Sequence, residues 1–96
     1  MIREIEESHE FKQAKKRISK SGRHSKIMQE RFAHAVIMLA CDKPLDYSYR
    51  DHPLIGNLLG YRECHLAFDL VLVYKYIGDD VLLLDKLGSH SDVLGL

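Results

Sequence analysis

The sequence predicts an α+β domain in which a helical hairpin packs on one face of a largely antiparallel four-stranded sheet, in the order β-α-α-β-β-β. Apolar residues recur at helical spacing through residues 8–41, whereas the chain after Pro44 contains short runs of β-type composition between turn residues. With 96 residues, of which 46% are hydrophobic, the chain has enough material for one two-layer core. We therefore expect a single domain over residues 1–96.

The first helix is expected to follow a short edge strand over residues 1–6. Ser8 is suited to the N-cap of this helix, where its hydroxyl accepts a backbone hydrogen bond. Gly22 ends the helix at a position where glycine is favoured. The apolar residues of this helix are Phe11, Ala14 and Ile18.

The second helix is expected to run from about Ser25 to Cys41, and Pro44 prevents its continuation. Its apolar stripe faces the sheet, so the outer surface of the helical hairpin is basic. The stripe consists of Met28, Phe32, Ala35, Val36 and Leu39, with Ile27 and Met38 beside it.

Three strands are expected after a loop over Tyr47–Gly60. They are Tyr61–Ala67, Leu70–Ile77 and Val81–Leu87, with turns at Phe68-Asp69 and Gly78-Asp79-Asp80. The middle strand is apolar on both faces, so we expect it to be central and covered on one side by the helices. Gly88 ends the last strand, and a short tail follows.

The composition argues against several classes of protein. No apolar run reaches the ~18–20 residues that cross a bilayer, and charge begins at Arg3, unlike a secretory signal. Cys41 and Cys64 are too few for a disulfide framework and are expected to be free thiols. We therefore expect a cytoplasmic protein without membrane contact.

The net charge of zero conceals a basic segment. Residues 12–31 contain eight basic side chains and one acidic side chain, whereas residues 32–96 contain five basic and nine acidic ones. Such a segment favours contact with a polyanion or with an acidic partner protein, although a solvated helix face is the more common explanation of a charge run alone. The basic residues predicted to contact such a polyanion, RNA included, are Lys15, Lys16, Arg17, Arg62 and Lys75.

Three histidines and one aspartate fall at the ends or bends of the expected strands. His52 lies in the loop, His65 on the first of the three strands, Asp69 at the following turn and His90 just past the last strand. Each residue alone is as compatible with a structural role as with a functional one. Together they are expected to share one cleft, where imidazoles that titrate near neutrality beside a carboxylate would supply general acid–base chemistry.

Two other kinds of site are possible but less favoured than the acid–base site. The three histidines and Asp69 could bind zinc, but their spacing matches no compact zinc motif. Cys64 beside His65 could form a nucleophilic pair, but adjacent residues of a strand point to opposite faces, so Cys64 is expected to be a buried thiol. We therefore expect no metal and no other cofactor.

Several motifs also occur in a characteristic order. They are Asp51-His52-Pro53-Leu54, Gly60-Tyr61-Arg62-Glu63-Cys64-His65 with Asp69, Leu72-Val73-Tyr74 and Gly88-Ser89-His90-Ser91. This order and spacing resemble the YafQ-like branch of the RelE toxin superfamily. The resemblance covers essentially the whole chain, and residues 49–95 contain its specific part.

The resemblance implies a RelE-like fold and a toxin of a bacterial type II toxin–antitoxin system. The implied activity is that of a ribosome-dependent mRNA endonuclease, which needs no metal and cleaves by attack of the ribose 2′-hydroxyl on the adjacent phosphorus. The functional positions of the family match His52, His65, Asp69 and His90, and Glu63 stands where related sequences have an acid. The implied partners are a cognate antitoxin, the ribosome and mRNA, with operator DNA contacted only through the antitoxin complex.

The chemistry of RNA cleavage suggests roles for these residues. Asp69, or His65 oriented by Asp69, is predicted to act on the base side, and His90 as the general acid. Charge on the phosphate would be stabilised by protonated His52 together with Arg62 or Lys75.

Three positions depart from the family pattern. Phe68 stands where members often have proline, Leu70 where some have tryptophan, and Leu94 where the tail usually has an aromatic residue. Leu70 and Leu94 keep open a second function, that of a non-catalytic or weakened toxin homologue that binds an antitoxin as a co-repressor module. A ribosome-independent RNase with the same acid–base residues is a third possibility.

Overall fold

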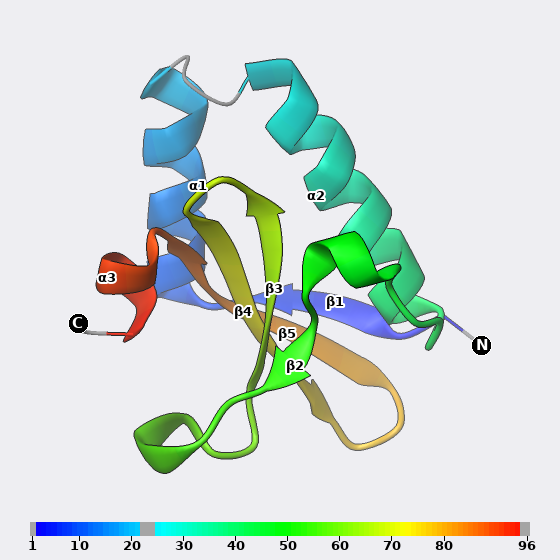
Figure 1. Ribbon diagram of the computed structural model, residues 1–96. Helices are drawn as coiled ribbons and strands as arrows, with labels where there is room; N and C mark the ends of the chain where they lie inside the picture. Colours follow the sequence, from blue (N-terminus) through cyan, green and yellow to red (C-terminus); the bar gives the residue numbers. More distant parts are fainter. Residues whose placement is uncertain (1, 22–24, 95–96) are drawn as a thin grey trace.

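The computed structural model describes residues 2–21 and 25–94, and in this range it forms a mixed five-stranded sheet covered on one face by two helices (Figure 1). The strand order is β1-β5-β4-β3-β2. β1 lies parallel to β5, and the other neighbouring strands are antiparallel. The strands are β1 (Glu4–Glu7), β2 (His52–Pro53), β3 (Arg62–Ala67), β4 (Leu70–Ile77) and β5 (Val81–Gly88).

The α+β class is confirmed, but the expected number of four strands is wrong. The additional strand is β2, which lies in the segment expected to be a loop and pairs His52 with Glu63 and Pro53 with Arg62. A strand of two residues is too short to show the alternation that identifies strands in a sequence. Pro53 has no N–H to donate, which suits β2 to the edge of the sheet.

The helical hairpin consists of α1 (His9–Ser21) and α2 (Ser25–Ala40). The predicted N-cap is confirmed, because the Ser8 hydroxyl accepts a hydrogen bond from the Phe11 N–H at 3.0 Å. Gly22 and the side chains of Ile27 and Met28 lie outside the part of the chain that the structure describes. Between the helices and the sheet lies the main core, which includes Phe11, Ala35, Leu39, Leu66, Leu72, Tyr74 and Leu82.

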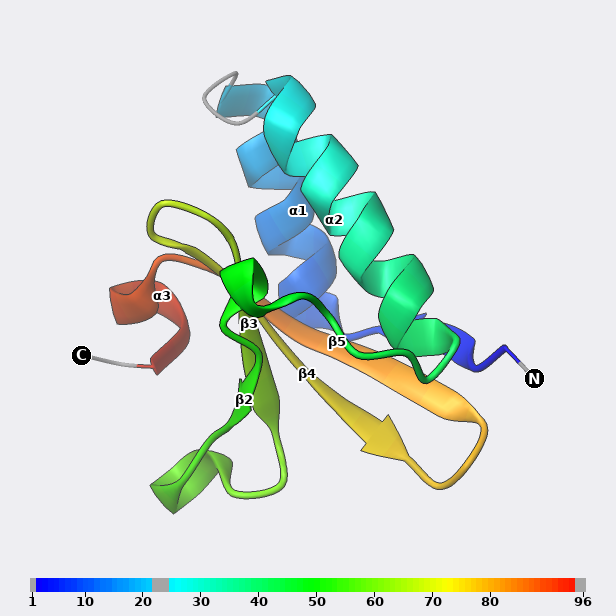
Figure 2. The same ribbon diagram turned by 45° about the vertical axis from the view of Figure 1, so that its right-hand side comes forward.

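The opposite face of the sheet has a smaller apolar group, and within the described part of the chain no pair of helices covers it (Figure 2). Val71 and Val73 of β4 pack there with Val93 and with the partly buried Leu54 and Tyr61. Two short 3-10 helices, η1 (Tyr47–Tyr49) and η2 (Gly56–Leu58), flank β2 in the chain. This more open face contains the candidate site.

The segment after β5 is a helix and not the expected short tail. It forms α3 (His90–Leu94), which begins where the Ser89 hydroxyl accepts a hydrogen bond from the Asp92 N–H at 3.1 Å. Val93 is 5% exposed and anchors α3 on the sheet. This helix was not predicted because five residues are too few to show helical periodicity.

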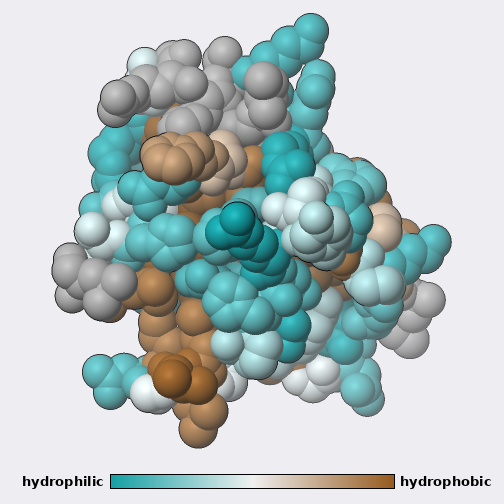
Figure 3. Space-filling view, viewed as in Figure 1, coloured by the Kyte–Doolittle hydropathy of each residue, from teal (hydrophilic) through white to brown (hydrophobic). Residues whose placement is uncertain are grey.

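No helix within residues 2–21 and 25–94 is both long enough and apolar enough to span a bilayer. In the space-filling view, hydrophilic side chains cover the centre of the face shown in Figure 1, and hydrophobic ones gather below it near η2 (Figure 3). Ile55 and Leu59, which flank η2, are 85% and 77% exposed.

Candidate active site

Strand β3 sends alternate side chains to the two faces of the sheet, as the sequence predicts. Cys64 and Leu66 are fully buried in the main core beneath the helices. Glu63 and His65 lie on the opposite, more open face. The order of residues along one strand therefore separates the packed face from the candidate site.

Glu63 is the centre of this site, and its side chain is surrounded by three imidazoles. Its Oε1 atom lies 3.2 Å from His52 Nε2, 3.5 Å from His65 Nε2 and 3.7 Å from His90 Nε2. Glu63 is only 3% exposed, and among the described residues its Oε2 atom has no hydrogen-bond partner. A buried carboxylate needs donors, and this one can accept a hydrogen bond from whichever imidazole carries a proton at Nε2.

Two different elements bring His52 and His65 together. β2 places His52 directly opposite Glu63 in the register of β3, and the His52 ring is fixed by a 2.6 Å contact between its Nδ1 atom and the Arg50 carbonyl oxygen. The ring of His65 lies 6.4 Å from that of His52, measured between centroids.

The third imidazole comes from the start of α3. His90 stands 4.9 Å from His65 between ring centroids. Asp69 Oδ1 lies 3.0 Å from both the backbone nitrogen and Nδ1 of His90. Asp69 adopts φ 51°, a left-handed conformation at the β3–β4 turn that aspartate tolerates better than most residues. The turn thus orients His90 and not His65, contrary to the expectation that Asp69 would orient His65.

The surroundings shift the pKa values of two of these groups. Burial lowers the pKa of His65 below its usual range, and the positive charge of Arg50 acts in the same direction, whereas Glu63 opposes the shift. Hydrogen bonds from the backbone N–H and the side chain of His90 lower the pKa of Asp69. At neutral pH, His65 is therefore mostly neutral and Asp69 is ionised.

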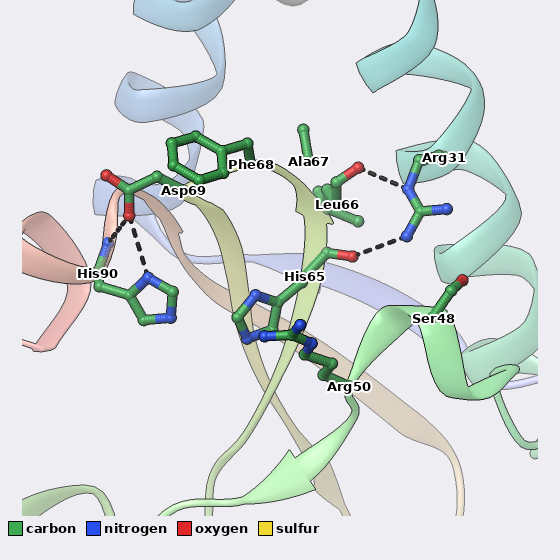
Figure 4. Close-up of a pocket in the computed structure, with 9 residues that line it drawn as sticks. All are labelled: Arg31, Ser48, Arg50, His65, Leu66, Ala67, Phe68, Asp69 and His90. Carbon is green, nitrogen blue, oxygen red and sulfur yellow. Dashed lines mark hydrogen bonds and ion pairs between the residues drawn. The ribbon is translucent and has the colours of Figure 1, made fainter.

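A pocket of about 700 Å³ opens beside the cluster (Figure 4). Its lining includes His65, Asp69 and His90 together with two arginines, Arg31 from α2 and Arg50 from the end of η1. Phe68 stands at the rim with 97% of its surface exposed. The pocket therefore combines acid–base groups, positive charge and one accessible aromatic ring.

Arg31 is held in place by backbone and aromatic contacts. Its Nε donates to the Leu66 carbonyl oxygen at 2.6 Å, and its Nη2 donates to the His65 carbonyl oxygen at 3.1 Å. Its guanidinium also lies 4.0 Å from the ring centroid of Tyr49. Arg31 thus fastens α2 to the end of β3, next to His65.

The structure does not bring Arg62 and Lys75 to the histidine cluster. Arg62 points to the helix-covered face, where its Nε lies 3.3 Å from Asp51 Oδ1. The Tyr74 hydroxyl donates a hydrogen bond to the same oxygen of Asp51. Lys75 Nζ lies 4.8 Å from the ring centroid of Tyr61. The partners of Arg62 and Lys75 are thus outside the pocket beside His65.

The other predicted RNA contacts lie on α1. Lys16 and Arg17 are exposed, and Arg17 lines a second pocket that also contains Asp69. Lys15 pairs with Glu7 at 3.1 Å. These residues form a separate basic surface from the arginines of the site.

Sequence reasoning missed the central position of Glu63 and the presence of Arg31 and Arg50. The strand period puts Glu63 beside His65, which is a usable signal. The contact between Glu63 and His52 depends on β2, and the contact with His90 depends on α3, and neither element is visible in the sequence.

Three of these side chains could also hold a metal ion. Glu63, His65 and His90 each offer one ligand atom, and the three atoms lie within 4.8 Å of one another. Imidazole and carboxylate groups suit zinc or copper. A metal would bind the same imidazoles that acid–base chemistry must leave free to exchange protons, so the two uses of the site compete.

Comparison with known proteins gives a consistent result. The sequence profile of the bacterial YafQ toxin of type II toxin–antitoxin systems matches residues 3–95. An mRNA interferase toxin YafQ of Escherichia coli strain B/BL21-DE3 is 31% identical over 93 residues, covering 97% of this chain and 97% of that protein. The structure is similar to a metal-bound toxin from Helicobacter pylori, with a TM-score of 0.83, 39% identity and coverage of 97% of this chain and 99% of that one. It is also similar to a chain of the E. coli DinJ–YafQ toxin–antitoxin complex, with a TM-score of 0.81, 30% identity and coverage of 99% and 100%.

Proposed function

The chain belongs to the YafQ family of bacterial toxins of type II toxin–antitoxin systems, and on this premise we propose that it is an mRNA endonuclease that acts on the ribosome and inhibits translation. The observation that carries the proposal is the convergence of three imidazoles on buried Glu63 beside an arginine-lined pocket. RNA supplies its own nucleophile, the 2′-hydroxyl. The enzyme must supply a base, an acid and positive charge.

His65 is the general base in this proposal. Its lowered pKa keeps it neutral. In the tautomer that donates Nε2–H to Glu63, the lone pair of His65 Nδ1 accepts the proton of the 2′-hydroxyl. Glu63 then stabilises the imidazolium that forms, as a carboxylate does when it faces a catalytic histidine. Asp69 is a weak base because its pKa is lowered.

His90 is the general acid. Asp69 accepts a hydrogen bond from Nδ1 of His90, which leaves Nε2 to donate a proton to the leaving 5′-oxygen. The O2′–P bond forms as the P–O5′ bond breaks, so the products are a 2′,3′-cyclic phosphate and a 5′-hydroxyl. Protonated His52, fixed by Arg50 and Glu63, adds positive charge beside the reacting phosphate.

Because the RNA supplies the nucleophile and the histidines move the protons, the proposed reaction requires no metal ion. A metal held by Glu63, His65 and His90 would remove the base and the acid. We expect EDTA to leave cleavage unchanged and added zinc to inhibit it. Loss of activity in EDTA, with recovery on addition of a divalent ion, would overturn this part of the proposal.

The proposed partners are the ribosome, mRNA and a cognate antitoxin, with operator DNA reached only through the antitoxin complex. Exposed Lys16 and Arg17, together with Lys15, supply a basic surface for ribosomal RNA phosphates or for an acidic segment of the antitoxin. If they contact RNA phosphates, replacing each by glutamine should weaken ribosome binding and reduce its dependence on salt.

The test is inducible expression in a bacterial host of the wild type, His90→Ala and the control His9→Ala, with primer extension on one abundant message. His9 is exposed at the start of α1, outside the cluster. We expect rapid growth arrest and new breaks in the message with the wild type and His9→Ala, and neither with His90→Ala.

The other outcomes contradict parts of the proposal. If a folded wild type causes no arrest, the chain acts as a non-catalytic antitoxin-binding module. If His90→Ala arrests growth equally, toxicity does not depend on the cluster. Cleavage of purified RNA without ribosomes, at the rate seen with them, would identify a ribosome-independent RNase.

A further inference from the structure

The pocket beside the histidine cluster is lined by two arginines, and they differ in what they bind. The guanidinium of Arg31 donates two hydrogen bonds to backbone carbonyls and lies over Tyr49. The guanidinium of Arg50 makes no hydrogen bond or ion pair with any residue among 2–21 and 25–94. Arg50 is therefore the arginine of this pocket whose donors are available to a ligand.

The backbone of Arg50 is held in an unusual conformation. Its φ is 50°, in the left-handed region that few non-glycine residues adopt. The Arg50 N–H donates to the Tyr47 carbonyl oxygen at 3.0 Å, and the Arg50 carbonyl oxygen lies 2.6 Å from His52 Nδ1. The contacts that fix Arg50 thus also fix His52, and the left-handed conformation is retained at the edge of the candidate site.

The side chain of Arg50 extends toward His65. In the close-up view the Arg50 side chain reaches from the end of η1 toward the His65 ring (Figure 4). The positive charge of Arg50 contributes to the lowered pKa of His65, as do His90 and His52. The negative charge of Glu63 acts on His65 in the opposite sense.

Taking the endonuclease function proposed above as its basis, we propose that Arg50 is a catalytic residue that binds the scissile phosphate and stabilises the negative charge that develops on it during cleavage. The unpartnered guanidinium faces the pocket that His65 and His90 line. A guanidinium can hold two phosphate oxygens at once through parallel N–H donors. No proton is transferred to or from Arg50, because its guanidinium stays charged throughout. This assigns to Arg50 the role that the sequence suggested for Arg62 or Lys75, whose partners lie elsewhere.

The first experiment requires no ribosome. The imidazole signals of His65 and His90 are followed by NMR during titration with inorganic phosphate and with acid, in the wild type, Arg50→Gln, Arg50→Lys and the control Lys43→Gln. Lys43 is exposed beyond the end of α2, outside the pocket. We expect phosphate to shift both signals in the wild type and the control, and to bind Arg50→Gln at least about tenfold more weakly, with partial recovery in Arg50→Lys. The pKa of His65 should rise in Arg50→Gln.

The second experiment measures cleavage of ribosome-bound message under single-turnover and saturating conditions. Arg50→Gln should lower the maximal rate by about 10²–10³-fold, as expected when a donor to a developing oxyanion is removed. Arg50→Lys should recover part of the rate, and Lys43→Gln should match the wild type. Thermal unfolding of each variant verifies that the fold is retained.

The two experiments separate failure of this inference from failure of the proposed function. If the wild type does not cleave RNA, the endonuclease proposal fails. The catalytic role of Arg50 then fails with it, whether or not the protein binds inorganic phosphate. If the wild type cleaves and Arg50→Gln cleaves at the same maximal rate, the inference on Arg50 alone is overturned. Unchanged phosphate affinity in Arg50→Gln also overturns it.

Discussion

Two polar clusters flank β3 on opposite faces of the sheet, and they differ in how completely their groups are satisfied. On the helix-covered face, Asp51 receives hydrogen bonds from Arg62 and from Tyr74, whose side chain is fully buried. On the open face, Glu63 has three imidazoles near one oxygen and no partner among the described residues at the other. The first cluster is closed, whereas the second retains groups that can bind or exchange protons.

Strand β3 thus contributes to the packed structure through one face and to the candidate site through the other. Asp51 and His52 are neighbours in the chain, so the closed cluster fixes the segment that supplies one imidazole to the open cluster. An arrangement in which every group is satisfied contributes stability, whereas unsatisfied buried groups persist where they serve binding or catalysis. Substitutions in the open cluster should therefore lower activity more than stability, and substitutions in the closed cluster should lower stability more than activity.

The largest effect is expected from Glu63→Gln. The amide keeps the size of the side chain but cannot stabilise an imidazolium by charge, so single-turnover cleavage should fall by about 10²–10⁴-fold. The free energy of unfolding should change by less than about 1 kcal/mol, because removing a buried charge offsets the loss of its contacts. Urea unfolding and cleavage assays are to be run on the same preparation. Strong destabilisation with retained activity would indicate that Glu63 is structural.

A smaller loss is expected from Asp69→Asn. The asparagine oxygen can still accept a hydrogen bond from the His90 N–H, but the negative charge that favours the proton on His90 is lost. Cleavage should fall by about 10–10²-fold, and thermal stability should change little because Asp69 is exposed. Single-turnover cleavage and thermal unfolding are to be measured on the same preparation of this variant and of the wild type. An unchanged rate would remove Asp69 from the mechanism.

Tyr74→Phe examines the closed cluster. Loss of the buried hydroxyl removes one donor to Asp51, so the free energy of unfolding should fall by about 1–3 kcal/mol. Cleavage should fall by about tenfold at most, because His52 keeps its own contacts to Arg50 and Glu63. A loss of activity as large as that of Glu63→Gln, at full stability, would mean that the two clusters are not separate.

The lowered pKa of His65 predicts a dependence of stability on pH. A depressed pKa in the folded state means that the unfolded chain binds the proton more tightly, so stability is fully present above the unfolded pKa of about 6.5. It is lost as pH falls through the folded pKa of His65. Urea unfolding at pH 5 and pH 7.5 should show a smaller difference for His65→Gln than for the wild type. An equal difference would show that His65 is not the group responsible.

The smallest effect concerns the thiols. Burial raises the pKa of Cys64 to about 12, so this thiol is unreactive at neutral pH. Iodoacetamide should modify half-buried Cys41 first and leave Cys64 intact in the folded protein. Rapid modification of Cys64 with loss of cleavage would support the alternative that Cys64 and His65 form a nucleophilic pair.

The parts of the fold with a clear period were predictable from the sequence. The Ser8 cap, the two helices and the hairpin of β4 and β5 follow local rules, and the alternation along β3 places Glu63 and His65 on one face and Cys64 on the other. The two-residue β2 and the five-residue α3 are too short to show a period. Tertiary packing sets the contacts that depend on β2 and α3, so no local pattern in the sequence predicts them. These contacts are the one between Glu63 and His52 and the one between Asp69 and His90.

The most direct test of the open cluster as an acid–base site is analysis of the ends of the cleaved message, together with a message that carries one 2′-deoxynucleotide at the cut. Attack by the 2′-hydroxyl, assisted by His65 and His90, predicts a 2′,3′-cyclic phosphate, a 5′-hydroxyl and no cleavage at the deoxynucleotide. A 5′-phosphate end and equal cleavage of the deoxy substrate would contradict the account, and would instead indicate hydrolysis by an activated water.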